Sequence, residues 1–179
     1  IEYLLFLLKV CSLVDYLICN KIYQESSFGK ENKLSEEVEL RAYFNLKRLN
    51  MILAVLEKKC GFKLSSQDVF LNIAGGINVS DPSMDLAVIA SLLSSHKDSP
   101  INSTICFAGE VGLNGEVRPI ARIDHHIQEA ERIGFKTIVI SSYNQQDNKK
   151  FNIKVVKCSK VMDLSKFLSK CFISCFILL

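Results

Sequence analysis

The chain has 179 residues, of which 49% are hydrophobic and 23% are charged, and its formal net charge is +3. This length and apolar content suffice for one well-packed core and exclude two ordinary domains. The weak basic excess permits contact with nucleic acid, but it does not indicate a dedicated basic groove, which usually shows clustered lysine and arginine.

Cysteine usage indicates the cellular compartment and argues against a metal site. The seven cysteines are odd in number and form no CxxC pair, so they fit a reducing cytoplasm better than a disulfide framework. Cys171 and Cys175 lack a second pair of ligands nearby, as a zinc site would require. We expect a cytoplasmic protein that binds neither a metal nor another cofactor.

Residues 1–37 are predicted to be an atypical apolar segment followed by a polar linker. The chain begins at Ile1 instead of a methionine, for which a fragment or a decayed reading frame is the plain explanation. Within residues 3–19, ten Leu, Ile, Phe or Val residues each favour a membrane by about 0.3 to 0.6 kcal/mol, whereas Lys9 and Asp15 each oppose it by about 2.5 to 3.5 kcal/mol. The sum is close to zero or unfavourable, so we expect a packed or surface-lying helix instead of a membrane span.

A long helix is predicted from Val38 or Asn45 to Lys59, with Gly61 as its stop. Its apolar face consists of Leu49, Ile52, Leu53, Val55 and Leu56. Four basic residues lie near its two ends, namely Lys47, Arg48, Lys58 and Lys59. One interpretation is that they contact the phosphates of a nucleic acid and position it without reading its sequence. The alternative is a solvated helix face on which lysine favours the negative end of the helix dipole.

The next region alternates extended and helical patterns. Residues 68–73 alternate apolar and polar side chains, which predicts a strand, and residues 77–79 resume an extended run. A helix should follow, because Asp81 can cap its free N–H groups, Pro82 suits its first position and Asp85 lies at the positive end of its dipole. This helix is apolar on all its faces, so we expect other elements to cover it on every side.

The rest of the chain continues the alternation. Residues 104–108 predict a strand, and Asn114-Gly115 predicts a hairpin with a type I′ turn. An amphipathic helix is expected from Arg122 to Ile133, with Gly134 as its C-terminal stop. Strands at residues 135–140 and 153–156 and a closing helix that contains Val161, Leu164 and Leu168 complete the pattern. The order of elements predicts an α/β fold, a mixed sheet with helices packed on it.

Four stretches of this sequence together resemble a known family. They are RLNMILAVLEKKCGF, DVFLNIAGGINVSDPSMDLAV, FAGEVGLNGEVRPI and EAERIGFKTIVIS. In this fixed order they are similar to the C-terminal Lon-protease-like domain of the bacterial RadA/Sms DNA-repair family. The resemblance implies a Lon-like domain of the ribosomal-protein-type βαβ fold, which we place at residues 38–169, with residues 170–179 as an apolar tail.

The same resemblance implies a candidate catalytic position. It places Ser83 where Lon has its nucleophile and Asp124 where Lon has the lysine that acts as the base. A carboxylate cannot replace a desolvated neutral amine, whose lowered pKa makes it a base near neutrality. We therefore predict that Ser83 is a relic and that the chain has no catalytic residue. The alternative is a triad of Ser83 and Asp85 with His125 or His126, but both histidines are expected on the polar side of their helix.

Function and partners follow from the resemblance. It implies DNA as a partner and a homo-oligomeric ring, without a small-molecule substrate. No GxxxxGK[ST] motif occurs in the chain, so the ATPase module of the family is missing and we predict that the chain is not an enzyme. The predicted function is a non-proteolytic scaffold for oligomer assembly and DNA contact in recombinational DNA repair. The alternatives are an active Ser-type peptidase domain and a nonfunctional truncated remnant.

Overall fold

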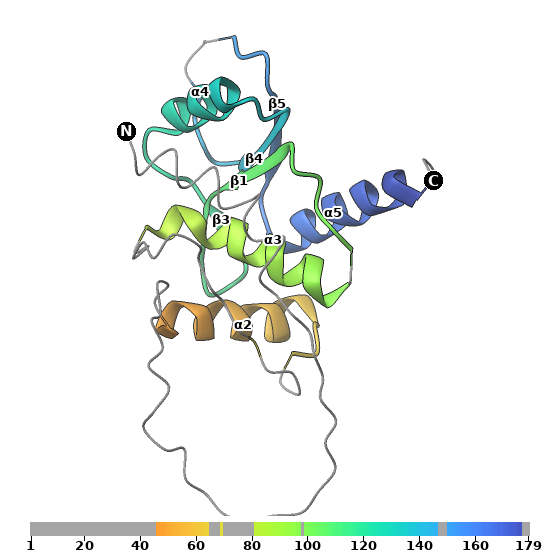
Figure 1. Cartoon of the computed structure of the whole chain (residues 1–179). Coiled ribbons are helices and arrows are strands. Elements are labelled where there is room, and N and C mark those ends of the chain that lie inside the picture. The colour runs from red at the N-terminus through yellow and green to blue at the C-terminus, as the bar shows by residue number, and fades with distance from the viewer. Residues whose placement is uncertain (1–45, 65–68, 70–80, 98, 147–149, 177–179) are drawn as a thin grey trace, which may run out of the picture.

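The computed structural model of the chain describes residues 46–64, 69, 81–97, 99–146 and 150–176 (Figure 1). Its helices are α2 (Leu46–Cys60), the short 3₁₀ helix η2 (Pro82–Met84), α3 (Asp85–His96), α4 (Ile123–Ile133) and α5 (Val161–Phe176). Its strands are β1 (Ile105–Ala108), β2 (Glu110–Val111), β3 (Val117–Arg118), β4 (Thr137–Ser141) and β5 (Lys154–Cys158). The predictions for residues 1–37 and for strands at residues 68–73 and 77–79 lie outside the described residues, Val69 excepted.

Among the described residues, the central sheet has three parallel strands in the order β1-β4-β5. Ile105 of β1 pairs with Thr137 of β4, which pairs in turn with Lys154 of β5. Strands β2 and β3 form a separate antiparallel ribbon. Because parallel neighbours cannot be joined by a tight turn, the chain crosses from β1 to β4 through the ribbon and helix α4. The prediction of an α/β fold is confirmed.

Helices cover both faces of the sheet. Figure 1 shows α4 over one face, α3 and α5 against the other, and α2 beyond α3. Helix α3 is buried along nearly its whole length, as its apolar faces predicted. The core joins all these layers, and its largest fully buried side chains include Ile52, Leu86, Leu93, Ile127, Ile138 and Leu164. Burying one such side chain stabilises the fold by roughly 1.5 to 3 kcal/mol.

The hairpin is confirmed, but its turn is not of type I′. A type I′ turn needs positive φ at two central residues, whereas Gly115 has φ of 77° and Asn114 does not have a positive φ. The Gly115 N–H donates to the Gly112 carbonyl at 2.9 Å, so the loop is a type I turn followed by a left-handed glycine. The carboxylate of Glu116 accepts from the Asn114 N–H at 3.0 Å, which stabilises this longer loop.

One helix start differs from the prediction, and the last helix is long. Arg122 has a left-handed backbone, with φ of 53°, and precedes α4 instead of opening it. Helix α5 continues to Phe176, so the predicted boundary between domain and tail, at residues 169 and 170, falls inside a helix. Within the described part of the chain, no helix is both long and apolar enough to cross a membrane.

Candidate functional site

Ser83 lies where the start of a helix meets the end of a strand. Asp81 has an extended backbone and its Oδ1 accepts from the Ser83 N–H at 2.9 Å, so the predicted N-cap is confirmed. The Ser83 carbonyl accepts from the Gly109 N–H at 2.8 Å, and the Gly109 carbonyl accepts from the Leu86 N–H at 3.1 Å. The backbone of Ser83 is therefore fixed between η2 and the segment that joins β1 to β2.

Gly109 makes this close approach possible. A Cβ atom at residue 109 would lie 3.0 Å from Cγ1 of Val117 and 3.4 Å from Cδ2 of Leu86. The first separation is tighter than ordinary carbon contacts, so a side chain here would displace the ribbon or the helix. The absence of a side chain thus lets α3 and β3 approach the same backbone segment.

The hydroxyl of Ser83 is buried and has no base beside it. Ser83 is 5% exposed, and within the described residues its Oγ has no hydrogen-bond partner. No described lysine therefore activates it in this conformation. Leaving a buried hydroxyl without a partner costs about 1 to 3 kcal/mol, so the position carries a stability cost that a well-bonded serine would avoid.

The residues expected around Ser83 divide between surface and interior. Asp124 lies in the first turn of α4 and is half-buried, whereas His125 is exposed. His126 is only 8% exposed, so the prediction that both histidines lie on the polar side of the helix is wrong for His126. Helical spacing explains this, because His126 lies three residues after the buried Ile123 and four before the buried Ala130, on the same helix face. No hydrogen bond joins either histidine to Ser83 among the described residues.

Burial also changes the chemistry of His126. It lowers the pKa of the imidazole below its ordinary value, and the electrostatic effect of the neighbouring His125 adds to this lowering. The nearby carboxylate of Asp81 raises the pKa but does not cancel the lowering. We therefore assign a neutral imidazole to His126 at physiological pH. The same carboxylate caps Ser83, which places His126 in the electrostatic surroundings of the helix start.

Asp85 has a role that the sequence did not reveal. It is fully buried, and Nε and Nη2 of Arg48 donate to its two carboxylate oxygens at 2.6 Å and 2.5 Å. The Val111 N–H donates to Oδ2 at 2.9 Å. Burial raises the pKa of Asp85, whereas these hydrogen bonds and the charge of Arg48 lower it. One carboxylate thus holds α2, α3 and the ribbon together.

A chain of charged groups continues outward from this pair. Nη2 of Arg48 lies 3.6 Å from Oε1 of Glu110, and Nη1 of Arg118 lies 3.5 Å from the same oxygen. Nη2 of Arg118 lies 2.8 Å from Oε1 of Glu116. The network joins the start of α2 to the turn of the hairpin. Exposed members contribute little to stability, so the buried Arg48–Asp85 pair is its structural part.

This network bears on the predicted nucleic-acid contacts. Arg48 is engaged by buried and half-buried carboxylates, which gives it a structural role. Lys47, Lys58 and Lys59 are exposed on α2. For these lysines, contact with phosphates stays a prediction. No group of three or more His, Cys, Asp or Glu residues that could hold a metal ion occurs in the described ranges.

With this geometry established, comparison with known proteins defines the family. A family model described as subunit ChlI of Mg-chelatase matches residues 45–144, and the chain belongs to this family. The chain is also similar to the DNA repair protein RadA of several bacteria, which confirms the resemblance to the RadA family found in the sequence.

The similarity to RadA covers most of this chain and a small part of each relative. The identity is 48% over 118 residues with RadA of Listeria monocytogenes, which covers 66% of this chain and 24% of that protein. It is 40% over 119 residues with RadA of Bacillus subtilis, covering 66% of this chain and 25% of the relative. It is 37% over 140 residues with RadA of Helicobacter pylori strain 26695, covering 78% and 29%. The chain thus spans about a quarter of the length of these relatives.

These comparisons correct one prediction. The conclusion that the chain is not an enzyme is contradicted, because its family is described as a subunit of an enzyme, Mg-chelatase. The similar proteins are DNA repair proteins named RadA. The prediction relied on the absence of two features, a P-loop and a lysine base. The chain spans only about a quarter of the length of the relatives. Such absences do not exclude an enzyme.

Proposed function

We propose that residues 38–169 are the Lon-like domain of a RadA-type DNA repair protein. In this proposal the domain is a non-proteolytic scaffold that supports oligomer assembly and DNA contact for an ATPase in recombinational repair. The similarity to RadA supports the repair role. The sequence motifs support the Lon-like assignment, because they occur in the order that the resemblance requires.

One observation carries the non-proteolytic part of the proposal. The Ser83 hydroxyl is buried without a hydrogen-bond partner among the described residues. In addition, the resemblance implies Asp124 at the position of the lysine base. A serine is a weak nucleophile unless an adjacent base accepts its proton. His126 is neutral and buried but no hydrogen bond connects it with Ser83, so the geometry supports a structural role for this serine.

The test is a proteolysis assay on the full 179-residue chain. The pure protein is incubated with unfolded casein, in parallel with Ser83→Ala. We expect no cleavage by either protein. Cleavage by the wild-type chain that disappears in Ser83→Ala would establish a peptidase and refute the scaffold proposal. Cleavage that persists in both would identify a contaminating protease.

The assembly part of the proposal has its own test. Sedimentation velocity over a range of concentrations measures the mass of the chain in solution. We expect a species heavier than the 20.2 kDa monomer whose population rises with concentration. A chain that remains monomeric throughout would contradict assembly through this domain, and a chain without a cooperative unfolding transition would support a nonfunctional remnant.

A further inference from the structure

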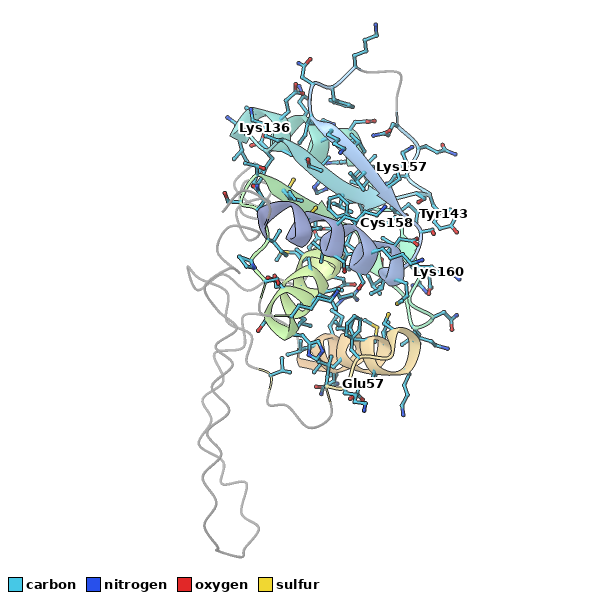
Figure 2. All side chains as sticks on the ribbon, turned by 90° about the vertical axis from the view of Figure 1, so that its right-hand side faces the viewer. Glu57, Lys136, Tyr143, Lys157, Cys158 and Lys160 are labelled. Carbon is cyan, nitrogen blue, oxygen red and sulfur yellow. The ribbon has the colours of Figure 1, made fainter. Side chains whose placement is uncertain are left out.

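The carboxyl end of the parallel sheet presents an exposed aromatic ring beside two lysines. Tyr143 follows β4 and is 63% exposed, and Lys157 and Lys160 near the end of β5 are exposed as well. Figure 2 shows Lys157, Tyr143 and Lys160 on the same side of the molecule. The Ser142 N–H donates to the Cys158 carbonyl at 2.8 Å, which joins the two segments directly. The three residues therefore belong to one surface.

The backbone that carries Tyr143 is fixed on several sides. The Asn144 N–H donates to the Ser141 carbonyl at 3.2 Å and closes a turn with Tyr143 inside it. Nδ2 of Asn144 donates to the Ile120 carbonyl at 2.9 Å, and Oγ of Ser141 donates to the Val117 carbonyl at 2.6 Å. Asn144 and Ser141 are both buried. A turn anchored by two buried residues thus carries an exposed ring that lies outside the described core.

The carboxylates near the lysines are already engaged. Oδ2 of Asp163 accepts from the Ser159 and Lys160 N–H groups at 3.1 Å and 3.0 Å and from the Ser159 hydroxyl at 2.7 Å. The side chain of Glu116 is bound by Arg118 and by the Asn114 N–H. Within the described residues, neither Lys157 nor Lys160 makes an ion pair. Both ammonium groups are available to an external anion.

The surrounding sequence has the charge that an anionic polymer requires. Between residues 134 and 176 the chain has eight lysines against two aspartates, whereas the whole chain has a net charge of only +3. The basic excess is therefore concentrated in the β4-to-α5 region. Such a local excess attracts a polyanion and raises its rate of association.

We propose that Tyr143, Lys157 and Lys160 form a contact site for single-stranded nucleic acid. A base stacks on the exposed Tyr143 ring, and the two lysines bind the flanking phosphates. An aromatic platform with neighbouring cations is how proteins bind single strands without sequence preference. A duplex fits less well, because its bases are stacked on each other and are not free to cover a side-chain ring. This inference rests on the proposed DNA contact and assigns it to a surface other than α2.

The experiment measures fluorescence anisotropy of a labelled oligothymidylate and of a labelled hairpin duplex with the full chain. We expect Tyr143→Ala to weaken binding of the single strand about tenfold. Tyr143→Phe keeps the ring and should stay within about twofold of wild type. The double variant Lys157→Gln with Lys160→Gln should make the slope of log K against log salt shallower by about 1.4, since each phosphate contact on a single strand contributes about 0.7.

Lys136 and Lys154 supply the matched control. They are exposed and lie together at the amino end of the same strands, where the Lys154 N–H donates to the Lys136 carbonyl at 3.0 Å. The double variant Lys136→Gln with Lys154→Gln removes the same charge and should change the affinity by less than about twofold. Circular dichroism and a thermal melt confirm that each variant is folded.

The outcomes separate this inference from the proposed function. If the wild-type chain binds neither probe, the proposed DNA contact fails and the assigned surface fails with it. If the wild type binds and Tyr143→Ala and the Lys157/Lys160 variant bind equally well, only the assigned surface is refuted. Loss of binding in Lys58→Gln with Lys59→Gln alone would then locate the contact on α2. Binding of the duplex only would overturn the single-strand assignment and leave DNA contact intact.

Discussion

The guanidinium of Arg48 binds the buried carboxylate of Asp85 across a separation of 37 residues in the sequence. Asp85 is fully buried, whereas the side chain of Arg48 is 26% exposed. The pair fixes α2 to the start of α3. A fork of two parallel hydrogen bonds sets both the distance and the orientation of the two groups.

Removal of Arg48 should therefore destabilise the protein strongly. Arg48→Met leaves a buried carboxylate without its cation, and we expect the free energy of unfolding to fall by about 3 kcal/mol. Urea unfolding followed by circular dichroism measures this change. Lys58→Met, which removes an exposed charge from the same helix, should cost less than about 0.5 kcal/mol. The double variant Arg48→Met with Asp85→Leu should recover part of the loss. An effect of Arg48→Met no larger than that of Lys58→Met would contradict the assigned role.

Ser83 allows the opposite prediction. Its hydroxyl is buried without a described partner, so Ser83→Ala should leave the free energy of unfolding unchanged or raise it by up to about 1 kcal/mol. The matched control is Ser141→Ala, because the buried Ser141 hydroxyl donates to the Val117 carbonyl at 2.6 Å. That variant should lose about 1 to 3 kcal/mol. A comparable loss in Ser83→Ala would reveal a hydrogen bond of Ser83 that is not found among the described residues.

His126 should make stability depend on pH. Because burial lowers its pKa in the folded state, the unfolded chain binds a proton at a pH where the folded protein does not. Stability is therefore highest above the ordinary histidine pKa of about 6.5, and falls as the pH decreases below that value. Urea unfolding at about pH 7.5 and about pH 5.5 measures the difference. We expect His126→Gln to reduce this difference, whereas His125→Gln removes only the smallest cause of the lowered pKa and should preserve most of it. Equal pH dependence in wild type and His126→Gln would disprove the assignment.

Gly115 should be sensitive to its backbone conformation alone. A Cβ at this residue would lie 3.5 Å from Cβ of Lys59, an ordinary contact, so space is not the constraint. The φ of 77° is the constraint, and Gly115→Ala should cost about 1 to 2 kcal/mol. Gly115→Asn should cost less, since asparagine adopts this conformation more readily. Thermal unfolding of the two variants tests whether backbone conformation is the constraint at residue 115. Equal melting temperatures of Gly115→Ala and Gly115→Asn would refute this prediction.

Local signals in the sequence predicted the elements well. The apolar faces of α3 and the apolar stripe of α4 arise from the spacing of apolar residues within a single segment. This spacing can be read directly from the sequence. The N-cap at Asp81 was predictable for the same reason, because its bond partner is two residues away. The hairpin was predictable from Asn114-Gly115, but the turn type was not. It depends on a bond between Glu116 and the Asn114 N–H.

The candidate site was harder to predict. The Arg48–Asp85 pair joins distant segments. The sequence around each residue does not indicate which residue it pairs with. His126 is different, because a signal was present: it lies three residues after Ile123 and four before Ala130, two members of the apolar stripe of this helix. The position of His126 on the helix predicts burial, although its side chain is polar. The exposure of Tyr143 depends on how the turn after β4 is anchored, which only the folded chain shows.

The lack of a side chain at residue 109 constrains how related sequences can diverge. The space that a methyl group would occupy is filled by Val117 from one direction and Leu86 from the other. A larger residue at 109 would be tolerated only alongside a smaller one at 117 or 86. Substitutions at these three sites should thus be inherited as sets, even though 31 residues of chain separate the outermost two.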